Sequence, residues 1–513
     1  MKKRIVAILL VGSLLFAGCG TQGEPSNSES KNTESENNSE STTINTDEVF
    51  SNRDFKTEYE ENCVYIKLNG SSATCESNAV EINGTTITIK DEGTYAVSGV
   101  LQNGMIVVDS ESTDKTQIVL NGVSIHNDAS AAIYIKQSDK VFLTLEEGAE
   151  NILSSGDSFE VIDEEEIDGV IYSKDDLTLN GKGSLSINSP GGHGIVSKDD
   201  LIITGGNYTI DAANHGIAAN DMLGIADGNF KIESGEDSIH CDMNIYIEGG
   251  TFEINAKDDA VHADETLQIC GGKINITNSY EGLEALDIKV SGGEMYIVAS
   301  DDGLNAAGGT DSSGFGGMRN DQFGGQGGRP GGRPGGGQGG RPGGHGGDSG
   351  EQGNPGGEGN QEGFGEMNSG SSDGSIMITG GNLSIKAYGD GIDANGTLEI
   401  TGGFVTVCGP TQGDTATLDY DVSGVISGGT FIGTGGQMMA QTFSDSEQGV
   451  IGVQVGNQQA GTLITLTDSN GNVVISHEPE LPFAIVILSS PEMKKGETYI
   501  ITVGELSGEF EAE

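Results

Sequence analysis

Basic residues and tryptophan are scarce in this chain. Its 513 residues include 25 Lys and Arg against 78 Asp and Glu, a formal net charge of −53, and no Trp. A surface of this sign repels phosphate groups, which argues against nucleic acids and anionic lipid surfaces as partners. It suits cations, neutral ligands, or acidic ligands that are reached through a bridging cation.

Cysteine is scarce as well. Only six are present, and none has the C-x-x-C spacing of a zinc cluster, so the sequence does not favour such a site. Cys63 and Cys75 are close enough in sequence for a disulfide in an exported protein, and the sequence leaves their pairing open. Cys241, Cys270 and Cys408 are expected to be small packing residues.

A long apolar run is found only at the start of the chain. Residues 1–18 have a basic end and an apolar stretch that is too short to span a bilayer permanently, which predicts a signal peptide. The Phe-Ala-Gly-Cys ending resembles a bacterial lipobox, so we expect cleavage before Cys19 and lipidation of its thiol. Residues 19–50 have little to bury and are expected to be a disordered tether. The protein is thus expected on the extracellular face of a bacterial membrane, held there only by its lipid.

Helical periodicity is absent from the rest of the sequence, where short alternating strands recur instead. Apolar anchor residues repeat every 22 residues: Ile195, Ile217, Ile239, Val261 and Leu283. A glycine turn such as Gly205-Gly206 follows most anchors by ten residues. This pattern predicts an all-β fold, a right-handed parallel β-helix in which identical positions of successive coils stack about 4.8 Å apart.

The repeat also sets the expected domains. These are an N-terminal β cap with the first coils (51–110), the main β-helix (111–307), a flexible glycine-rich insertion (308–373), the continued β-helix (374–440) and a C-terminal β-module (441–513). In the last of these, Asn470-Gly471 separates two alternating runs and predicts a hairpin. The module is expected to be antiparallel and to cover the open end of the helix.

Acidic residues recur at fixed positions around the anchors. The set is Asp237, Asp242, Asp258, Asp259, Asp264, Glu281, Asp301, Asp302, Asp390 and Asp393, of which Asp237, Asp259, Glu281 and Asp302 form one outward column. Like charges stacked at about 5 Å repel by roughly 1 to 3 kcal/mol per pair, so the column either raises carboxyl pKa values or binds a hard cation. We predict that these residues hold Ca²⁺, which takes oxygen ligands in irregular geometry. The alternative is a solvated acidic edge that only prevents aggregation.

Two histidines share the register of the acids. His240 and His262 lie 22 residues apart, with Asp242 and Asp264 nearby. A transition-metal site is conceivable with these residue types. Two stacked histidines without a third ligand more often pack or contact a ligand, and the sequence favours that interpretation.

The D-G-I-x-A and L-x-I-T-G-G segments, the glycine-rich insertion after "DDGLNAAGG" and the stretch "ATLDYDVSGVISGGTF" together resemble one family. It is the clostridial-type carbohydrate-binding β-helix family, related in fold to family 9 polysaccharide lyases, and the resemblance extends from Val64 to the end. It implies a surface-anchored binder of cellulose-like or pectin-like (polygalacturonate) chains, with Ca²⁺ at Asp237, Asp259, Asp302 and Asp390. The coils at Ile217 and Leu283 depart from the pattern, because His215 and Glu281 replace Asp in the column.

Three functions remain open at this point. The first is polysaccharide binding, in which tyrosines stack on sugar rings, although the lack of Trp weakens a flat platform for crystalline cellulose; the candidates are Tyr208, Tyr246, Tyr280 and Tyr296. The second is a calcium-dependent uronate lyase, in which Lys257 or Lys289 removes the proton beside the uronate carboxylate. The third is a purely structural adhesin. Lysines are sparse beside the acids, so the sequence favours binding, and it does not indicate an oligomeric state.

Overall fold

The computed structural model describes residues 3–4, 44, 49–60, 62–162, 165–307, 374–410, 413 and 415–513. Most of the expected signal peptide and tether, Cys19, and the whole insertion 308–373 lie outside the described residues. In the part of the chain that is described, no helix is long and apolar enough to cross a membrane.

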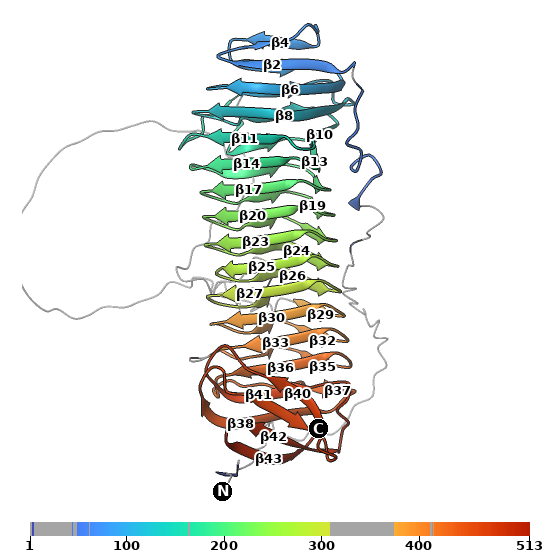
Figure 1. The fold of residues 1–513 in the computed structure, drawn as a ribbon, viewed down its shortest axis with the longest axis vertical. Coiled ribbons are helices and arrows are strands. Elements are labelled where there is room, and N and C mark those ends of the chain that lie inside the picture. Colours follow the sequence, from blue (N-terminus) through green and yellow to red (C-terminus); the bar gives the residue numbers. More distant parts are fainter. Residues whose placement is uncertain are drawn as a thin grey trace, which may run out of the picture. The chain divides into compact units, whose positions relative to one another are not determined.

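Short strands stack coil upon coil along the described chain (Figure 1). The anchors pair in parallel register on successive coils, Ile217 with Ile239 and Ile239 with Val261. This confirms the predicted fold class, a parallel β-helix with a 22-residue period. Each complete coil contributes one strand to each of three stacks, which we call the first, second and third ladders.

The three ladders contain the following strands. The first ladder is β2 (Val64–Gly70), β6 (Gly93–Leu101), β8 (Lys115–Asn127), β11 (Glu150–Ser155), β14 (Ser184–Ser189), β17 (Asn207–Ala212), β20 (Asn229–Ser234), β23 (Thr251–Ala256), β25 (Lys273–Asn278), β27 (Glu294–Ala299), β30 (Asn382–Ala387), β33 (Phe404–Cys408) and β36 (Thr430–Gly435). The second is the start of β8, β10 (Lys140–Leu145), β13 (Asp176–Gly181), β16 (Leu201–Ile203), β19 (Met222–Ile225), β22 (Asn244–Ile247), the ends of β24 (Val261–Ile269) and β26 (Leu283–Val290), β29 (Ser375–Ile378), β32 (Thr397–Ile400), β35 (Ser423–Ile426) and β37 (Asp445–Ser446). The third is β5 (Thr86–Ile89), β7 (Met105–Asp109), β9 (Ile133–Gln137), β12 (Gly169–Ser173), β15 (His193–Ser197), β18 (Ile217–Ala219), β21 (Ile239–Cys241), the starts of β24 and β26, β28 (Leu304–Ala306), β31 (Ile392–Ala394) and β34 (Asp419–Tyr420).

Antiparallel strands occur at both ends of the helix. At the N-terminal end, β3 (Ala73–Thr74) pairs with β2, and β4 (Val80–Asn83) pairs with β5. At the C-terminal end, β41 (Phe483–Ser489) joins the last first-ladder strand to β38 (Val450–Gln458). A separate antiparallel sheet contains β39 (Ile464–Thr467), β40 (Val473–His477), β42 (Thr498–Val503) and β43 (Leu506–Glu511), with β1 (Lys3–Arg4) beside β43. The β39–β40 pair confirms the hairpin predicted at Asn470-Gly471.

The core is a set of in-register side-chain columns. The anchors are fully buried together with the inward Ile, Leu and Val residues of the other ladders. Rings of Tyr208, Phe230 and Phe252 stack on consecutive first-ladder strands, with centroids 5.0 and 4.7 Å apart. Each buried aliphatic or aromatic side chain contributes about 1.5 to 3 kcal/mol, so a regular register produces a long core from local contacts. Tyr208 belongs to this core, which makes its expected role in sugar stacking wrong.

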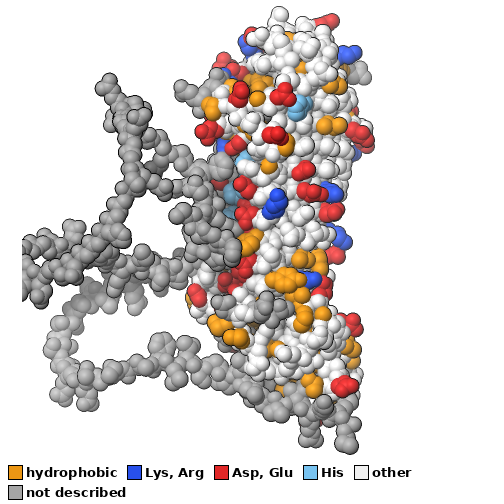
Figure 2. All heavy atoms as spheres, turned by 90° about the vertical axis from the view of Figure 1, so that its left-hand side faces the viewer, with side chains coloured by type: hydrophobic (Ala, Val, Ile, Leu, Met, Phe, Trp, Pro, Cys, Tyr) orange, Lys and Arg blue, Asp and Glu red, His pale blue; other side chains and the backbone are white. Residues whose placement is uncertain are grey.

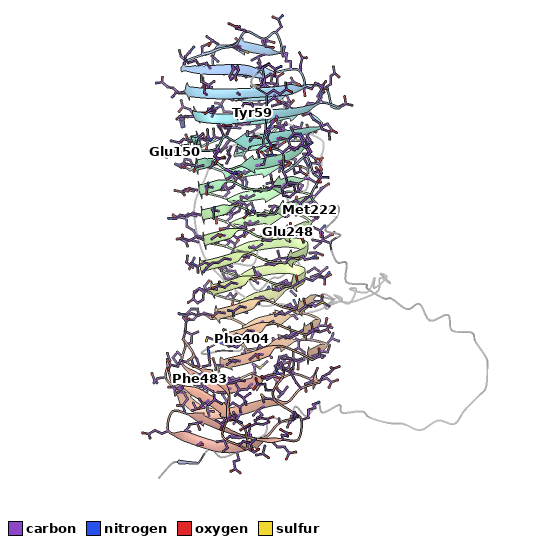
Figure 3. All side chains as sticks on the ribbon, turned by 45° about the vertical axis from the view of Figure 1, so that its right-hand side comes forward. Tyr59, Glu150, Met222, Glu248, Phe404 and Phe483 are labelled. Atoms are coloured by element: carbon purple, nitrogen blue, oxygen red, sulfur yellow. The ribbon has the colours of Figure 1, made fainter. Side chains whose placement is uncertain are left out.

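A segment before the first coil packs along the outer face of the second ladder. The ring of Phe50 lies 5.7 Å from that of Tyr246, and Tyr246 is buried there, so its expected contact with sugar is also wrong. Further along, the carboxylate of Asp54 accepts a hydrogen bond from Thr178 Oγ1 at 2.7 Å. Figure 3 labels Tyr59, which follows in this segment, and Met222 on β19. Residues 49–60 thus cover several successive coils.

Candidate functional site

The acids of interest lie where each coil passes from the first ladder to the third. Two sets of side chains meet there. The turn column stands two residues before each anchor: His193, His215, Asp237, Asp259, Glu281, Asp302 and Asp390. The strand column stands one residue after an anchor and pairs in register: His240, His262, Glu284, Asn305 and Asp393. Figure 2 shows the histidines beside Asp and Glu side chains on the face turned to the viewer.

The turn column is joined lengthwise by hydrogen bonds. A side-chain atom of one member accepts the backbone N–H of a residue on the next coil. The pairs are His193 Nδ1 with His215 N–H (3.1 Å), His215 Nδ1 with Asp237 N–H (3.2 Å), Asp237 Oδ1 with Asp259 N–H (2.9 Å), Asp259 Oδ1 with Glu281 N–H (3.0 Å), Asp302 Oδ1 with Asp390 N–H, and Asp390 Oδ1 with Ala416 N–H. One acceptor atom of each of these side chains therefore holds the backbone of the neighbouring coil.

The turn column is buried, although the sequence indicated an outward one. Asp237, Asp259, Glu281 and Asp302 are 5, 0, 2 and 7% exposed. The strand column contributes to this burial, since His262 and Glu284 are themselves buried. Burial removes the screening by water that makes stacked surface charges inexpensive, so each carboxylate here needs a specific partner.

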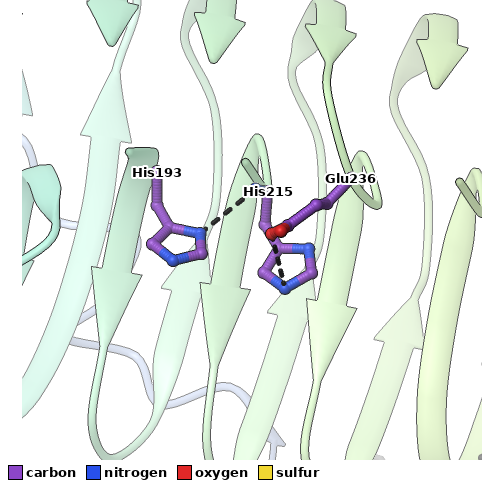
Figure 4. A group of neighbouring side chains, drawn as sticks. All are labelled: His193, His215 and Glu236. Atoms are coloured by element: carbon purple, nitrogen blue, oxygen red, sulfur yellow. Dashed lines mark hydrogen bonds and ion pairs between the residues drawn. The ribbon is translucent and has the colours of Figure 1, made fainter. Parts of the chain in front are cut away.

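Four imidazole rings stack on the N-terminal coils of the site, which we call its upper part. His193 and His215 have centroids 4.9 Å apart, and Figure 4 shows them with Glu236, whose carboxylate lies 3.6 Å from His215 Nε2. Each of these two rings accepts a backbone N–H through Nδ1, so its proton lies on Nε2. Burial lowers the pKa of His193 well below its usual value and that of His215 to about 4. Both rings are therefore neutral at physiological pH.

The next two rings are in the opposite state. His240 places Nδ1 3.0 Å from Asp237 Oδ2 and Nε2 3.2 Å from Asp242 Oδ1. Although burial opposes it, hydrogen bonds to these two carboxylates raise the pKa of His240 to about 9. His262 has a similar arrangement, and its pKa is raised well above the usual value by Asp259, Asp264 and Glu284 against the effect of burial. These two imidazolium rings act as counter-ions for the upper acids.

The middle of the site concentrates carboxyl groups. Asp259, Glu281 and Glu284 offer oxygens within 4.8 Å of one another. Burial, and then the neighbouring carboxylates, raise the pKa of Glu281 well above its usual value. Asn305 Nδ2 donates to Glu281 Oε2 at 2.9 Å. Glu284 was missed by sequence reasoning, and its only signal is its position one residue after the anchor Leu283, in register with His262.

The lower part of the site is built from carboxylates on either side of the insertion. Asp302, Asp390 and Asp393 place oxygens within 4.8 Å of one another. Burial, and then the charge of Asp390, raise the pKa of Asp302 to about 9. A Cβ at Gly389 would collide with Oδ1 of both Asp301 and Asp302, so the glycine makes room for these oxygens. Such an all-oxygen set suits a hard cation.

The remaining candidates are less central. Asp242 and Asp264 face the Nε2 atoms of the two cationic histidines. Asp258 and Asp301 occupy the position before the turn column and are half-buried. Lys257 is exposed at the end of the first-ladder strand, and Lys289 lies in the second ladder between Gln268 and Met377, outside both columns.

The structure also shows the state and burial of the five described cysteines. Cys63 and Cys75, whose pairing the sequence left open, are free thiols. Cys241 and Cys408 are buried, and Cys270 is half-buried, in keeping with small packing residues.

Comparisons with known proteins bear on this arrangement. A family model described as carbohydrate-binding domain-containing protein matches residues 83–318. A relative of the same description from Acetivibrio thermocellus is 31% identical over 216 residues, which cover 41% of this chain and 66% of the relative. A solved structure, that of the polysaccharide lyase-like protein from C. thermocellum as a gadolinium derivative, shares 31% identity with a TM-score of 0.40, and the match covers 48% of this chain and 98% of that one. The chain thus spans just under two thirds of that relative's length. The family match and the relative agree with the resemblance seen in the repeats, and residues 83–318 belong to the carbohydrate-binding domain family.

Proposed function

We propose that this protein binds acidic polysaccharide at the cell surface through Ca²⁺ held by Asp302, Asp390 and Asp393. The observation that carries the proposal is the meeting of these three carboxylates on adjacent coils, with oxygens within 4.8 Å. At the upper coils, protonated histidines balance the acids, whereas the side chains of this lower group are all carboxylates. A divalent ion among these carboxylates would offset both the burial and the repulsion from Asp390 that raise the pKa of Asp302.

The charge of the whole protein supports a bridging role for the ion. With a net charge of −53, the surface repels a polyuronate unless a cation lies between the two. Ca²⁺ accepts six to eight oxygens, so three side chains leave coordination positions for carboxylate and hydroxyl oxygens of a sugar. Membership of a carbohydrate-binding family makes a polysaccharide the expected source of those oxygens. The lipobox at Cys19 supports a location on the outer face of the membrane.

Retention on insoluble polysaccharide tests the proposal. Full-length protein is passed over immobilised polygalacturonate and over cellulose, with Ca²⁺ or with a chelator. We expect retention on polygalacturonate that requires Ca²⁺ and is lost in the Asp390→Asn/Asp393→Asn variant. Asp211→Asn/Glu233→Gln is the matched control, because it removes two exposed acids that stack on the first ladder.

The outcomes separate the components of the proposal. Equal loss in the control variant would assign retention to general charge. Retention that is unchanged by chelator would remove Ca²⁺ from the mechanism. Calcium-independent retention on cellulose alone would leave a carbohydrate-binding protein with a neutral ligand.

A further inference from the structure

The middle of the site differs chemically from the calcium site proposed above, because a histidine nitrogen meets carboxylate oxygens there. We propose that His262, Asp259 and Glu284 form a separate binding site for a divalent transition-metal ion of the zinc type. The proposal does not depend on polysaccharide binding. It concerns ligand atoms from two successive coils that the register of the β-helix brings together.

The distances between the donor atoms fit a single small ion. His262 Nδ1 lies 2.7 Å from Glu284 Oε2 and 3.3 Å from Asp259 Oδ2. Two ligand atoms that are each about 2.1 Å from one zinc ion and 2.7 or 3.3 Å from each other subtend an angle of about 80° or 105° at the ion. A calcium ion, with bonds of about 2.4 Å, separates its ligands further and rarely takes a nitrogen. The geometry and the imidazole therefore both favour a transition metal.

Two of the three ligands are oriented by contacts on the side away from the proposed ion. Asp259 accepts the Glu281 N–H through Oδ1 at 3.0 Å, which leaves Oδ2 directed at His262. His262 has Asp264 Oδ1 3.1 Å from its other nitrogen, Nε2. A carboxylate on the remote nitrogen is the usual outer-shell partner of a metal-binding histidine, because it fixes the tautomer that leaves the near nitrogen available. On metal binding the Nδ1 proton leaves to solvent and the metal takes its place.

Burial and charge also favour an ion at this position. Asp259, Glu284 and His262 are 0, 1 and 5% exposed at their side chains. Glu281 is also buried and offers an oxygen within 4.8 Å of those of Asp259 and Glu284, so three carboxyl groups lie together next to one imidazole. A divalent ion in place of one proton brings the group closer to neutrality, which is what a site of low dielectric requires. Asp264 is half exposed and gives the site a face toward water.

His193 and His215 are less suitable. His193 and His215 already use Nδ1 as acceptors for backbone N–H groups, so their Nε2 atoms carry protons. A metal on Nε2 would place a proton on Nδ1 against a backbone N–H. The His262 site has no such conflict, since both atoms that face its ring nitrogens across the site are carboxylate oxygens.

Zinc titration of the full-length chain, without an affinity tag and with Ca²⁺ present to saturate oxygen sites, tests the proposal. Calorimetry should show one tight zinc site per chain, and Co²⁺ in its place should give visible absorption of a nitrogen- and oxygen-bound ion. His262→Gln should weaken zinc by more than about 100-fold, and Asp264→Asn by about 10- to 100-fold, the usual effect of an outer-shell partner. Glu265→Gln is the control, because it removes an adjacent exposed charge from a residue whose backbone N–H donates to the Met243 carbonyl.

Three results would overturn the proposal: no stoichiometric zinc, equal affinity in His262→Gln and the wild type, or equal losses in Asp264→Asn and Glu265→Gln. Circular dichroism checks that each variant is folded. Should His262→Gln fail to fold, the comparison of Asp264→Asn with Glu265→Gln still decides, because both positions are exposed. Displacement of zinc by equimolar Ca²⁺ would also contradict the proposed zinc site.

Discussion

Replacing Asp302 by Asn should stabilise the protein when calcium is absent, and calcium should reduce that gain. The carboxyl group of Asp302 has a pKa of about 9 in the folded protein against a reference of 3.8. Its folded state holds a proton that the unfolded chain releases, so the contribution to stability is full below pH 4 and declines as pH rises toward 9. At pH 7, about 3.2 units above the reference pKa, the stability lost is roughly 4 kcal/mol. At pH 5, about 1.2 units above it, the loss is roughly 1.6 kcal/mol. These values are upper bounds, because the group is coupled to Asp390 and Asp393.

Asn has the shape of the protonated acid and does not titrate. Its Oδ1 can still accept the Asp390 N–H. In a chelator at pH 7, Asp302→Asn should therefore unfold at a higher urea concentration than the wild type, and the gap should shrink at pH 5. Added Ca²⁺ should narrow the gap, because an ion at 100 times its Kd stabilises the wild type by about 2.7 kcal/mol. A variant less stable than the wild type in chelator, or a gap that is the same at both pH values, would refute the reasoning.

Further predictions concern other parts of the molecule. Gly389→Ala should abolish stabilisation by Ca²⁺ in thermal melts, because its Cβ would collide with the carboxylates behind it; an unchanged calcium response would contradict this crowding. Asp54→Asn should cost about 3 kcal/mol in urea unfolding at pH 7, because it leaves a buried ion pair incomplete. Despite burial, hydrogen bonds lower the pKa of Asp54, so this contribution is present above pH 4 and lost below it, and a cost that is equal at pH 3 and pH 7 would be inconsistent. Ile239→Ala should cost about 2 to 5 kcal/mol, as for other fully buried positions; a loss under 1 kcal/mol would argue against a packed column. Polygalacturonate incubated with the protein and Ca²⁺ should show no rise in ultraviolet absorbance; a rise that Lys257→Ala or Lys289→Ala stops would identify a lyase.

The anchors show why the fold could be predicted from the sequence. A parallel β-helix turns a sequence period into spatial adjacency, so Ile217, Ile239 and Val261 identified their own neighbours. Even the irregular coil was visible, since Leu304 follows Leu283 by 21 residues, and the pairing of β24 with β26 has a register shift. In a parallel β-helix, the sequence period that is visible within a few coils also determines which residues are neighbours along the whole fold.

The environment of each side chain could not be read from the period. Register places Asp259 above Asp237, but its burial depends on what stands one residue after the anchor, and that position holds Ala218, His240, His262 and Glu284 in turn. These residues differ in chemical type and share only their position, so the sequence alone does not show that they form one column. Tyr208 was misassigned for a related reason, because alternation alone does not say which of two faces is the core.

The acid group at the lower part of the site lies at the seam between two stretches of chain. In the regular coils, hydrogen bonds of the turn column span 22 residues, for example from Asp259 N–H to Asp237, whereas the bond from Asp390 N–H to Asp302 spans 88. Closing a loop four times longer costs about 1.2 kcal/mol more in chain entropy. Cross-links that close the longest loops have the most to offset. The strand pairs β26–β29, β27–β30 and β28–β31 already join the two sides of the seam. An ion shared by Asp302 and Asp390 would add a cross-link to them, and the coils on the two sides would then unfold more cooperatively with the ion than without it.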